Sequence, residues 1–413
     1  MKVLVVGSGG REHALCWSLN ASPLVSELFC SPGNAGIEEI ATCFQSTDQD
    51  DLVKQALENE IDFVVVGPEV DLVAGLVDRL EQVGIKAFGP TAAAAKLEGS
   101  KAYMKQLCKD NDIPTAPFKI CNGPDEAKQH LNERGAPVVI KDDGLAAGKG
   151  VIVADTLEEA LDGVDTLVKN FNTTIFVVED KLTGVEISFF ALCDDTISLS
   201  LGAAQDYKRV GDGDIGLNTG GMGSFSPPGW FTEMMEQELL HIFVEPILEA
   251  MIAEGHPFNG VLFCGLMLPA SGCWSLLEYN VRFGDPETQV ILPRLETDLM
   301  ELLLATAENR LDEIEEIEWK DEAAVCVVMA NKGYPTHYTP GSIIHDLDEV
   351  EDALVFHAGT KKDGKVIKAV GGRVLNFVGT GLTMLEAKVN AYLGASSIWW
   401  PQGFCRNDIA EDK

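Results

Sequence analysis

Three glycine-rich loops in the first 100 residues each follow a short apolar run, and this repetition constrains the fold more than any other feature. The loops are GSGGREH after residues 3–6, SPGNAG after residues 28–30 and GPE after residues 63–66, and a fourth apolar run lies at 87–88. Such runs alternate with helical stretches, which predicts a parallel sheet with crossover helices. Ligands of these sheets bind at the carboxyl ends of the strands. We therefore expect an N-terminal Rossmann-like domain whose loops form a binding site.

The first of these loops allows three interpretations. GSGG enters a helix, so its backbone N–H groups can approach a phosphate at the helix N-terminus. It can equally be a structural turn. A dinucleotide fingerprint would need a third glycine at position 12 and an acidic residue after the second strand, where Glu12, Ser31 and Pro32 stand instead. NAD and FAD are therefore disfavoured, and the first two interpretations stay open.

The composition limits the partners of the chain. With 413 residues the chain is too long for one core of usual size, so we expect about two to four domains. Lys and Arg total 31 against 65 Asp and Glu, and the formal net charge of -34 repels nucleic acid unless a basic stripe is present. The sequence has no such stripe. Nucleic acid is therefore not an expected partner, and phosphate ligands need locally focused lysines, arginines and backbone N–H groups.

Cysteine usage and the N-terminus indicate the compartment. Ten cysteines lie scattered, without a Cys-x-x-Cys pair or a Cys/His cluster at zinc spacing, which argues against a structural metal and a disulfide framework. The apolar run in MKVLVVGSGG ends in glycines and not in a cleavage site, so it predicts a strand. No segment approaches the roughly 18 apolar residues of a membrane span. We expect a cytoplasmic protein that binds no membrane.

The rest of the chain divides where the pattern changes. Strands are expected at 138–141, 151–153, 175–179 and 186–193, with a helix at 157–168. A glycine-rich segment at 211–223 precedes a helix at 232–254 that Pro246 should kink, and residues 261–268 and 274–283 should pair around a polar turn. The acidic run at 312–322 marks a boundary. A strand AAVCVVMA, a hairpin at 361–365 and a helix at 382–393 follow it.

The segment VVIKDDGLAAGKGVIV combines a lysine with a glycine-rich turn. GLAAGKG superficially resembles a P-loop, but it has three residues between its first two glycines, ends without Ser or Thr and precedes a strand. A hairpin over a triphosphate, with Lys141 on the preceding strand supplying a point charge, fits this context better. The alternative is an ordinary flexible hairpin with a solvated lysine.

Two further strands carry polar side chains suited to a nucleotide and its metal ion. Glu278 and Asn280 in LEYNVRF are two residues apart, so on a strand they face the same side. A carboxylate and an amide oxygen at that spacing suit Mg2+ bound to ATP phosphates, and surface residues on an edge strand are the alternative. In IFVVEDKLTGVEIS, the connection after the strand can present backbone groups to an adenine edge, with Glu186 near a ribose hydroxyl. A plain connection is the alternative there.

Taken together, the motifs resemble in order and spacing those of the glycinamide ribonucleotide synthetase family of ATP-grasp ligases. They are GSGGREHAL, PGNAG, VVGPE, GPT with LEGSK, VIKDDGLAAGKGV, QDYKRVGDGD, NTGGMG, LEYNVRFGDPETQ, VFHAGTK and GGRVL, over essentially the whole chain. The resemblance implies a multidomain α/β and α+β fold. The N-terminal domain would span 1–100, the ATP-grasp domain 101–319 with a small mobile lid at about 117–188, and a mixed α/β C-terminal domain 320–413.

The resemblance also implies the reaction. Glycine, 5-phosphoribosylamine and ATP would give glycinamide ribonucleotide, ADP and phosphate in purine biosynthesis, with Mg2+ or Mn2+ as the metal. A carboxylate is a poor acyl donor, so the γ-phosphoryl group first moves to glycine, and the amine then attacks the acyl phosphate. Catalysis of this kind rests mostly on positioning and charge neutralisation. We expect the enzyme to be a monomer.

Residues that match the family's nucleotide site carry over one by one. Phosphate contacts fall on Lys101, Lys141, Gly148, Lys149 and Gly150. The adenine hinge, the ribose contact and the two metal ligands fall on Glu179, Lys181 and Leu182, on Glu186, and on Glu278 and Asn280, respectively.

The substrate site carries over in the same way. Sugar phosphate contacts fall on Gly9, Gly10, Asn34, Gly67, Pro68 and Glu69, and Glu69 suits ribose hydroxyls. Further substrate contacts fall on Asp206, Lys208, Arg209, Asp285 and a closing loop of Asn218, Thr219, Gly220, Gly221, Met222 and Gly223. Arg282 would hold the glycine carboxylate or the acyl phosphate, and with Lys141, Asn218, Gly220 and Gly221 it makes up the catalytic set. The alternative for Arg282 is a structural ion pair with Asp285.

Several positions depart from the family pattern. Asp142 replaces Ala, Asp180 and Lys181 replace Glu-Phe, Tyr207 replaces His, Leu217 replaces Pro, and the lid is short between 168 and 175. Because side chains alternate along a strand, we expect Asp142 to face away from the side that Lys141 faces. A non-catalytic nucleotide-binding protein and a ligase of another carboxylate are the alternative functions. The joint presence of Lys141, Glu278 and Arg282 disfavours the first.

Overall fold

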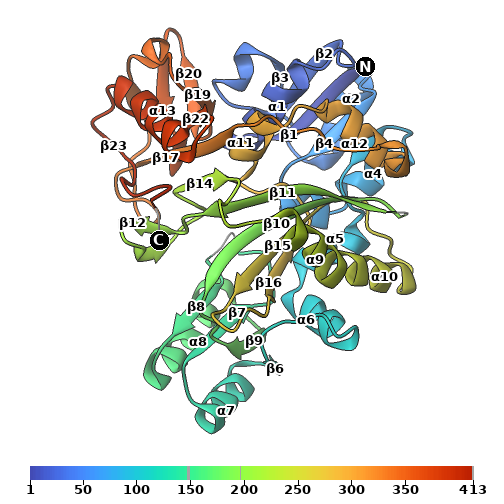
Figure 1. Cartoon of the computed structure of the whole chain (residues 1–413), viewed down its shortest axis with the longest axis vertical. Coiled ribbons are helices and arrows are strands. Elements are labelled where there is room, and N and C mark those ends of the chain that lie inside the picture. Colours follow the sequence, from blue (N-terminus) through green and yellow to red (C-terminus); the bar gives the residue numbers. More distant parts are fainter. Residues whose placement is uncertain (147–148, 196, 412–413) are drawn as a thin grey trace.

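The structure, a computed structural model, describes residues 1–146, 149–195 and 197–411. Its elements form an N-terminal parallel sheet, a long central sheet that continues into the C-terminal region, and a small sheet with two helices that extends from the rest at one end of the molecule (Figure 1). Within these described ranges, no helix is both long enough and apolar enough to cross a bilayer.

The N-terminal sheet has five parallel strands in the order β3-β2-β1-β4-β5. They are β1 (Lys2–Gly7), β2 (Glu27–Pro32), β3 (Thr42–Cys43), β4 (Phe63–Val66) and β5 (Lys86–Phe88). Four of them confirm the strands expected from the apolar runs, whereas β3, with two residues, is too short for a pattern to reveal. The sheet is buried on both faces, as expected for parallel strands. Loops after β1, β2 and β4 therefore meet at one edge.

Helices cover this sheet and lead the chain away from it. The helical segments are α1 (Gly10–Asn20), the 3-10 turn η1 (Ile37–Glu39), α2 (Gln49–Glu58), α3 (Glu69–Val73), α4 (Leu76–Gln82), α5 (Ala92–Gly99) and α6 (Lys101–Asp110). Ser100 ends α5 and caps α6, because its hydroxyl accepts a hydrogen bond from the backbone N–H of Tyr103. This cap fixes the start of α6, which carries Lys101 and Lys105.

The small sheet is antiparallel, with the order β6-β9-β7-β8. It comprises β6 (Phe118–Asn122), β7 (Val138–Asp142), β8 (Val151–Ala154) and β9 (Ile175–Asp180), with α7 (Pro124–Arg134) and α8 (Leu157–Phe171) packed on it. Its apolar residues form a core of their own around Ile140, Val164 and Phe176. A separate core would allow the unit to move as a body, and the mobile lid expected here stays a prediction. The hairpin of β7 and β8 confirms the two strands expected around the glycine-rich turn.

The central sheet has the order β16-β15-β10-β11-β14-β17-β22-β19, and β23 pairs with β17. Its strands are β10 (Val185–Cys193), β11 (Ser198–Asp206), β14 (Gly223–Ser226), β15 (Gly260–Leu268), β16 (Ser275–Asn280), β17 (Ala323–Asn331), β19 (Leu354–His357), β22 (Arg373–Gly381) and β23 (Gly403–Phe404). The pairing of β14 with β17 joins the regions before and after residue 320 into one sheet. Strands of the C-terminal region thus belong to the same sheet as β16, which carries Glu278 and Asn280.

The helix expected at 232–254 is interrupted near Pro246. It consists of α9 (Glu233–Leu239), a π-helical turn η2 (Leu240–Val244) and α10 (Glu245–Ala253). Proline has no N–H to donate and clashes with the preceding turn, so a wider turn just before it relieves both problems. The expected perturbation is confirmed, and it takes the form of a π turn.

The remaining elements are short. They are the hairpin β12 (Arg209–Gly211) and β13 (Ile215–Asn218), the helical segments α11 (Thr288–Ile291), η3 (Leu292–Arg294), α12 (Leu299–Ala307), η4 (Leu311–Glu313), η5 (Leu347–Glu349) and α13 (Met384–Ser397), and the sheet of β18 (Ser342–Ile344), β21 (Val366–Ala369) and β20 (Thr360–Asp363). The hairpin turn at 361–365 and the C-terminal helix confirm the sequence predictions.

Candidate active site

Two cavities meet between the N-terminal domain, the lid and the central sheet. A cavity of about 920 Å³ lies beside the N-terminal loops, and a second of about 1120 Å³ lies under the lid. We call them the substrate cavity and the nucleotide cavity. Val151, Asp206, Lys208, Thr219 and Glu278 line both. A group bound in one cavity can therefore reach a group bound in the other at these five residues.

The nucleotide cavity has a buried ionic network at its wall. Lys141 Nζ lies 2.5 Å from Glu179 Oε1 and donates to the carbonyl of Leu277, and Glu179 Oε2 lies 2.6 Å from Lys105 Nζ. Burial alone would lower the pKa of Lys141, but the carboxylates of Glu179 and Glu278 outweigh it and the pKa is raised. For Lys105 burial prevails over Glu179, and its pKa is lowered. Lys141 is thus held as a cation at the cavity wall.

The residues expected at the adenine hinge all line the nucleotide cavity, but they do different things there. Glu179, Lys181 and Leu182 lie at and after the end of β9. The carboxylate of Glu179 is already engaged by two lysines, so backbone groups and not this side chain are free for a base. Lys181 pairs with Asp155 at 2.6 Å, and Asp180 pairs with Arg134. The two departures from the family pattern are therefore satisfied within the lid.

In the described part of the glycine-rich turn, Leu145, Ala146 and Gly150 line the substrate cavity, whereas Lys149 is exposed. Gly148 lies outside the described residues. A Cβ at Gly150 would lie 2.6 Å from the Cβ of Ala146, which explains the need for glycine. Lys101 lines the substrate cavity and donates from Nζ to the carbonyl of Gly144 at 3.1 Å. This contact connects α6 to the turn.

Glu278 and Asn280 line the same cavity, as their spacing on β16 predicts. Burial raises the pKa of Glu278, but Lys141, Lys101 and Lys208 outweigh burial, so the pKa lies below its ordinary value and the carboxylate is ionised. Among the residues that the structure describes, no group of three or more His, Cys, Asp or Glu side chains is placed to hold a metal ion. A carboxylate and an amide oxygen beside lysines that are expected to bind phosphate nevertheless fit a cation that also takes phosphate oxygens.

Arg282 lies next to this pair and does not contact Asp285 as the alternative interpretation expected. Its Nε is 3.3 Å from Glu69 Oε2, its Nη2 is 3.3 Å from Glu98 Oε1, and Nη2 also donates to Asn280 Oδ1 at 3.2 Å. Burial would lower the pKa of Arg282, but Glu98 and Glu69 outweigh it and raise the pKa. The alternative interpretation, an ion pair between Arg282 and Asp285, is therefore wrong, because Asp285 pairs with Arg373.

The residues expected to hold the sugar phosphate fall into two groups. Gly9, Pro68 and Glu69 line the substrate cavity. Gly10, Asn34 and Gly67 instead face the protein interior: Asn34 donates to the carbonyls of Ser8 and His357, and a Cβ at Gly67 would lie 2.2 Å from Glu12 Oε1. These three fix the shape of the loops that the first group presents.

Glu12 explains why the first loop is not a dinucleotide fingerprint. It is 2% exposed, accepts a hydrogen bond from the N–H of Gly9 at 2.6 Å, and pairs with Arg11 at 2.6 Å. The carboxylate occupies the space under the loop and uses a backbone donor that a pyrophosphate would need. From the sequence alone, Glu12 was identified only as the residue that stands where a dinucleotide fingerprint has its third glycine. Its role depends on contacts between loops that spacing does not reveal.

The loop between β11 and β14 lines both cavities. Lys208 and Thr219, together with Asp206 at the end of β11, line both cavities. Arg209 and Asn218 line the nucleotide cavity alone, and Gly220 lines the substrate cavity alone. Asp285, from outside this loop, also lines the substrate cavity. Met222 and Gly223 are buried, and a Cβ at Gly223 would lie 2.7 Å from the carbonyl oxygen of Cys326, so these two support the loop from behind.

Charges at the junction perturb one another. Lys208 pairs with Glu186, the residue expected at the ribose. Burial would lower the pKa of Lys208, but Glu186, Asp206 and Glu278 outweigh it and raise the pKa. Burial also raises the pKa of Asp206, to about 7, against the opposing effect of Lys208. The junction thus places a firm cation beside a carboxyl group that titrates near neutrality.

The fold and these two cavities define the class. A lysine-bearing lid over an antiparallel sheet, with a carboxylate and an amide at the end of a neighbouring strand and a second cavity under a parallel-sheet domain, is the arrangement of an ATP-grasp ligase. The family follows from the comparisons. Sequence models of the phosphoribosylglycinamide synthetase N domain, ATP-grasp (A) domain and C domain match residues 1–98, 99–288 and 324–412. The chain therefore belongs to the phosphoribosylglycinamide synthetase family.

Individual relatives agree with this assignment over their full length. The chain is 49% identical to the phosphoribosylamine–glycine ligase of Brucella melitensis over 418 residues, covering 99% of this chain and 97% of the relative. It is 50% identical to that of Agrobacterium fabrum over 417 residues, covering 99% and 98%. The crystal structure of the Thermotoga maritima phosphoribosylamine–glycine ligase superposes with a TM-score of 0.88 at 34% identity, covering 99% of this chain and all of that one. The expected family, fold class and ATP-dependent ligase class are confirmed.

Proposed function

We propose that the chain joins glycine to 5-phosphoribosylamine with ATP, giving glycinamide ribonucleotide, ADP and phosphate. One observation carries the proposal beyond family membership: the two cavities share Val151 and four polar residues, Asp206, Lys208, Thr219 and Glu278. A reaction in which a phosphoryl group passes from a nucleotide to a small acid, and the acid then passes to an amine, needs such a junction. The relatives named as phosphoribosylamine–glycine ligases support the identity of the two substrates.

The chemistry proceeds in two displacements. A glycine carboxylate oxygen attacks the γ-phosphorus of ATP, the bond to the β,γ-bridging oxygen breaks, and glycyl phosphate and ADP form. The amine nitrogen of phosphoribosylamine then attacks the glycyl carbonyl carbon, the bond to the phosphate oxygen breaks, and the proton that the amine loses ends on the released phosphate. Both steps move negative charge between oxygens, so fixed cations and exclusion of water supply most of the acceleration.

The side chains divide these tasks by position. Lys141 and Lys208 neutralise phosphate charge at the nucleotide cavity and the junction, and Lys101 does so from the substrate side. Arg282 orients the glycine carboxylate or the acyl phosphate, because it lies between the acidic wall of the substrate cavity and Asn280. Gly9, Pro68 and Glu69 receive the 5-phosphoribosyl group, and Glu69 accepts hydrogen bonds from its ribose hydroxyls. The segment 218–223 closes over both substrates.

A divalent cation, Mg2+ or Mn2+, belongs to this scheme. Glu278 and Asn280 would hold it, and the ion would neutralise phosphate oxygens of ATP. Both side chains offer oxygen ligands, and Lys101, Lys141 and Lys208 would bind phosphates of the same nucleotide. This arrangement supports the choice of a divalent cation. We further propose that the enzyme works as a monomer in the cytoplasm, without membrane or nucleic acid partners. Its net charge of -34 supports the last point.

The alternative functions predict different turnover. A non-catalytic nucleotide-binding protein would bind ATP and release no ADP, and a ligase of another carboxylate would release ADP with an acid other than glycine. Coupled measurement of ADP release, with freshly made phosphoribosylamine, decides between them. We expect release only when glycine and phosphoribosylamine are both present. Equal turnover with alanine, or without the amine, would refute the proposed substrates.

A further inference from the structure

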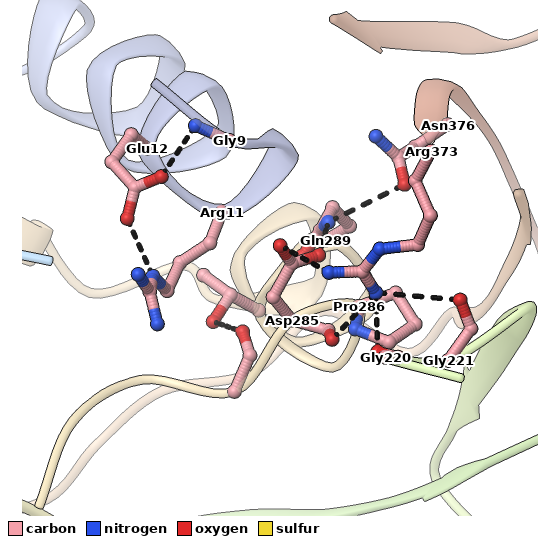
Figure 2. Close-up of polar contacts among 12 residues, drawn as sticks. Gly9, Arg11, Glu12, Gly220, Gly221, Asp285, Pro286, Gln289, Arg373 and Asn376 are labelled. Atoms are coloured by element: carbon pink, nitrogen blue, oxygen red, sulfur yellow. Dashed lines mark hydrogen bonds and ion pairs between the residues drawn. The ribbon is translucent and has the colours of Figure 1, made fainter. Parts of the chain in front are cut away.

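The motif GGRVL near the C-terminus has no part in the scheme so far, yet its arginine reaches the substrate cavity. Arg373 begins β22 and lines that cavity. Its guanidinium lies between two segments that belong to different motifs, the turn at Gly220 and Gly221 and the Asp285–Pro286 step (Figure 2). A C-terminal side chain thus contacts two parts of the site that are remote from it in sequence.

The contacts of Arg373 are several and specific. Its Nη1 donates to the carbonyl of Gly220, to that of Gly221 at 3.3 Å and to that of Asp285 at 2.9 Å, and its Nη2 donates to Asp285 Oδ2 at 2.8 Å. The other oxygen of the carboxylate, Oδ1, accepts from Gln289 at 2.7 Å. Both oxygens of Asp285 are therefore held, and the orientation of this side chain depends on the arginine.

The two glycines of the turn lie close to Arg373 and Pro286. A Cβ at Gly220 would lie 3.2 Å from Cζ of Arg373. Gly221 has φ of +108°, where other residues are strained, and a Cβ there would lie 2.4 Å from Cδ of Pro286. Glycine is therefore required at Gly221, whereas a side chain at Gly220 would have to displace the guanidinium of Arg373 by a few tenths of an ångström.

A second side chain of the C-terminal region holds the same turn. The hydroxyl of Tyr334 accepts a hydrogen bond from the N–H of Gly220 at 3.0 Å. Gly220 is thus bound through its N–H by Tyr334 and through its carbonyl by Arg373. Since Thr219 and Gly220 line the substrate cavity, the position of this wall is set by residues beyond 320.

We propose that Arg373 is a positioning residue for the reaction: it fixes the Gly220–Gly221 turn and Asp285 on the wall of the substrate cavity, so that the C-terminal region completes the active site. This inference rests on the proposed function for its kinetic consequences. Its structural consequence, the order of the turn, is independent of the substrates. An arginine suits the task because its planar guanidinium presents several donors in fixed directions, which a lysine does not.

The test compares Arg373→Met with a matched control in the full-length chain. Arg294 is the control, because it also donates to a backbone carbonyl (Glu322, 2.7 Å) and to a side chain (Ser226, 2.8 Å), and it lines neither cavity. We expect Arg373→Met to lower kcat/KM for glycine by about 30-fold or more, because small misplacements of a site wall cost up to about a hundredfold. The KM for ATP should change by less than about threefold. Arg294→Met should keep kcat/KM for glycine near that of the unsubstituted enzyme.

Amide exchange supplies the readout that a general loss of stability would not move. Exchange at Gly220, Gly221 and Met222 should accelerate by about tenfold or more in Arg373→Met and remain unchanged in Arg294→Met, while β15 stays protected in both. Arg373→Lys, which keeps the charge near Asp285, should recover part of the activity and serves as the second variant where Arg373→Met does not fold.

Three outcomes would overturn the proposal. They are a change of less than about threefold in kcat/KM for glycine, unaltered exchange at the turn, or a rise confined to the KM for phosphoribosylamine, which would make Arg373 a direct substrate contact. If the unsubstituted enzyme itself releases no ADP with glycine and phosphoribosylamine, the proposed function fails. The exchange measurement still tests the positioning role in that case.

Discussion

Lys105 and Lys141 share one buried carboxylate, that of Glu179, at 2.6 Å and 2.5 Å. Lys105 lies on α6, outside the lid, whereas Lys141 and Glu179 lie on lid strands β7 and β9. The network therefore crosses the base of the lid and keeps Lys141, the lysine proposed to bind phosphate, at the cavity wall. Because Glu179 is shared, each lysine limits how strongly the carboxylate attracts the other.

Replacement of Lys105 by Met tests this sharing. Without Lys105, Glu179 would attract Lys141 with its full charge and hold it away from phosphate, so we expect the KM for ATP to rise by about tenfold. Loss of one partner of a buried ion pair should also lower the free energy of unfolding by about 3 kcal/mol. Urea unfolding and ATP titrations measure the two effects. Lys109→Met, at an exposed position of the same helix, should change neither; an unchanged KM for ATP in Lys105→Met would contradict the idea.

Glu278→Gln tests the proposed metal pair. The substitution keeps an oxygen at the position but removes the charge, and we expect kcat to fall by about a hundredfold or more because a few kcal/mol of transition-state stabilisation are lost. Circular dichroism should show an intact fold. The check is kinetics over a range of Mg2+ concentrations. A near-normal kcat at saturating Mg2+ would show that catalysis does not depend on Glu278 as a metal ligand.

Sequence alone identified the parts of this site that depend on local pattern. The strands before the glycine loops, the same-face placement of Glu278 and Asn280, and the hairpin that carries Lys141 all follow from periods of two residues and from turn residues. Lys105 could not be assigned in this way. Its sequence context is that of any helix lysine, and only the arrival of β9 beside α6 makes it buried and paired.

Contacts between distant segments account for the other differences. Asp285 pairs with Arg373 and not with Arg282, because β22 joins the central sheet through β17. No local pattern in the sequence predicts that strand pairing. Glu12 was noted only for the glycine that it displaces, although it supports the first and third loops together. Polar residues whose partners lie on distant segments are thus the ones that sequence reasoning misplaces: Arg373 and Asp285 are 88 positions apart, and Arg282 and Glu69 are 213 positions apart.

His13 and His357 predict how the contact between the N-terminal and C-terminal regions responds to acid. His13 Nδ1 accepts a hydrogen bond from the N–H of His357 at 2.8 Å, and burial lowers the pKa of His13 to about 3 and that of His357 to about 4. Unfolded histidine binds a proton near pH 6.5, so the stabilisation from a neutral folded His13 is complete above that pH. It is lost as the pH falls from about 6.5 toward the folded values.

His13→Asn tests this dependence, because the amide oxygen of asparagine can accept the same hydrogen bond. Each unit of pH below about 6.5 should cost about 1.4 kcal/mol per histidine, so the unfolding free energy of the variant should fall by about 2 kcal/mol less between pH 6.5 and pH 5. Urea titrations at several pH values provide the measurement. His241→Asn, at an exposed site, should keep the slope of the unsubstituted protein, and equal slopes for all three proteins would refute the assignment.

Asp142 decides whether a departure from the family pattern affects nucleotide binding. At an effective dielectric constant near 20, a carboxylate about 6 Å from a phosphate would cost roughly 3 kcal/mol. Lys141 lines the nucleotide cavity, whereas Asp142 closes β7 and its Oδ2 accepts a hydrogen bond from the N–H of Gly144 at 3.1 Å. The carboxylate is thus used within the turn, and the neighbouring Asp143 faces α6, where it accepts from Ser100 at 3.0 Å and from the N–H of Ala102 at 2.6 Å.

We therefore expect Asp142→Ala to change the KM for ATP by less than about threefold, or about 0.65 kcal/mol where KM follows binding. Loss of the Gly144 hydrogen bond should cost about 1 kcal/mol of stability, seen as a lower urea midpoint. Asp143→Ala is the contrasting variant: it removes the contacts that tie the turn to α6, so it should raise the KM for ATP more than Asp142→Ala does. A tenfold fall in this KM on substitution of Asp142 would show instead that its carboxylate faces the phosphates, and the assigned direction of the β7 side chains would then be wrong.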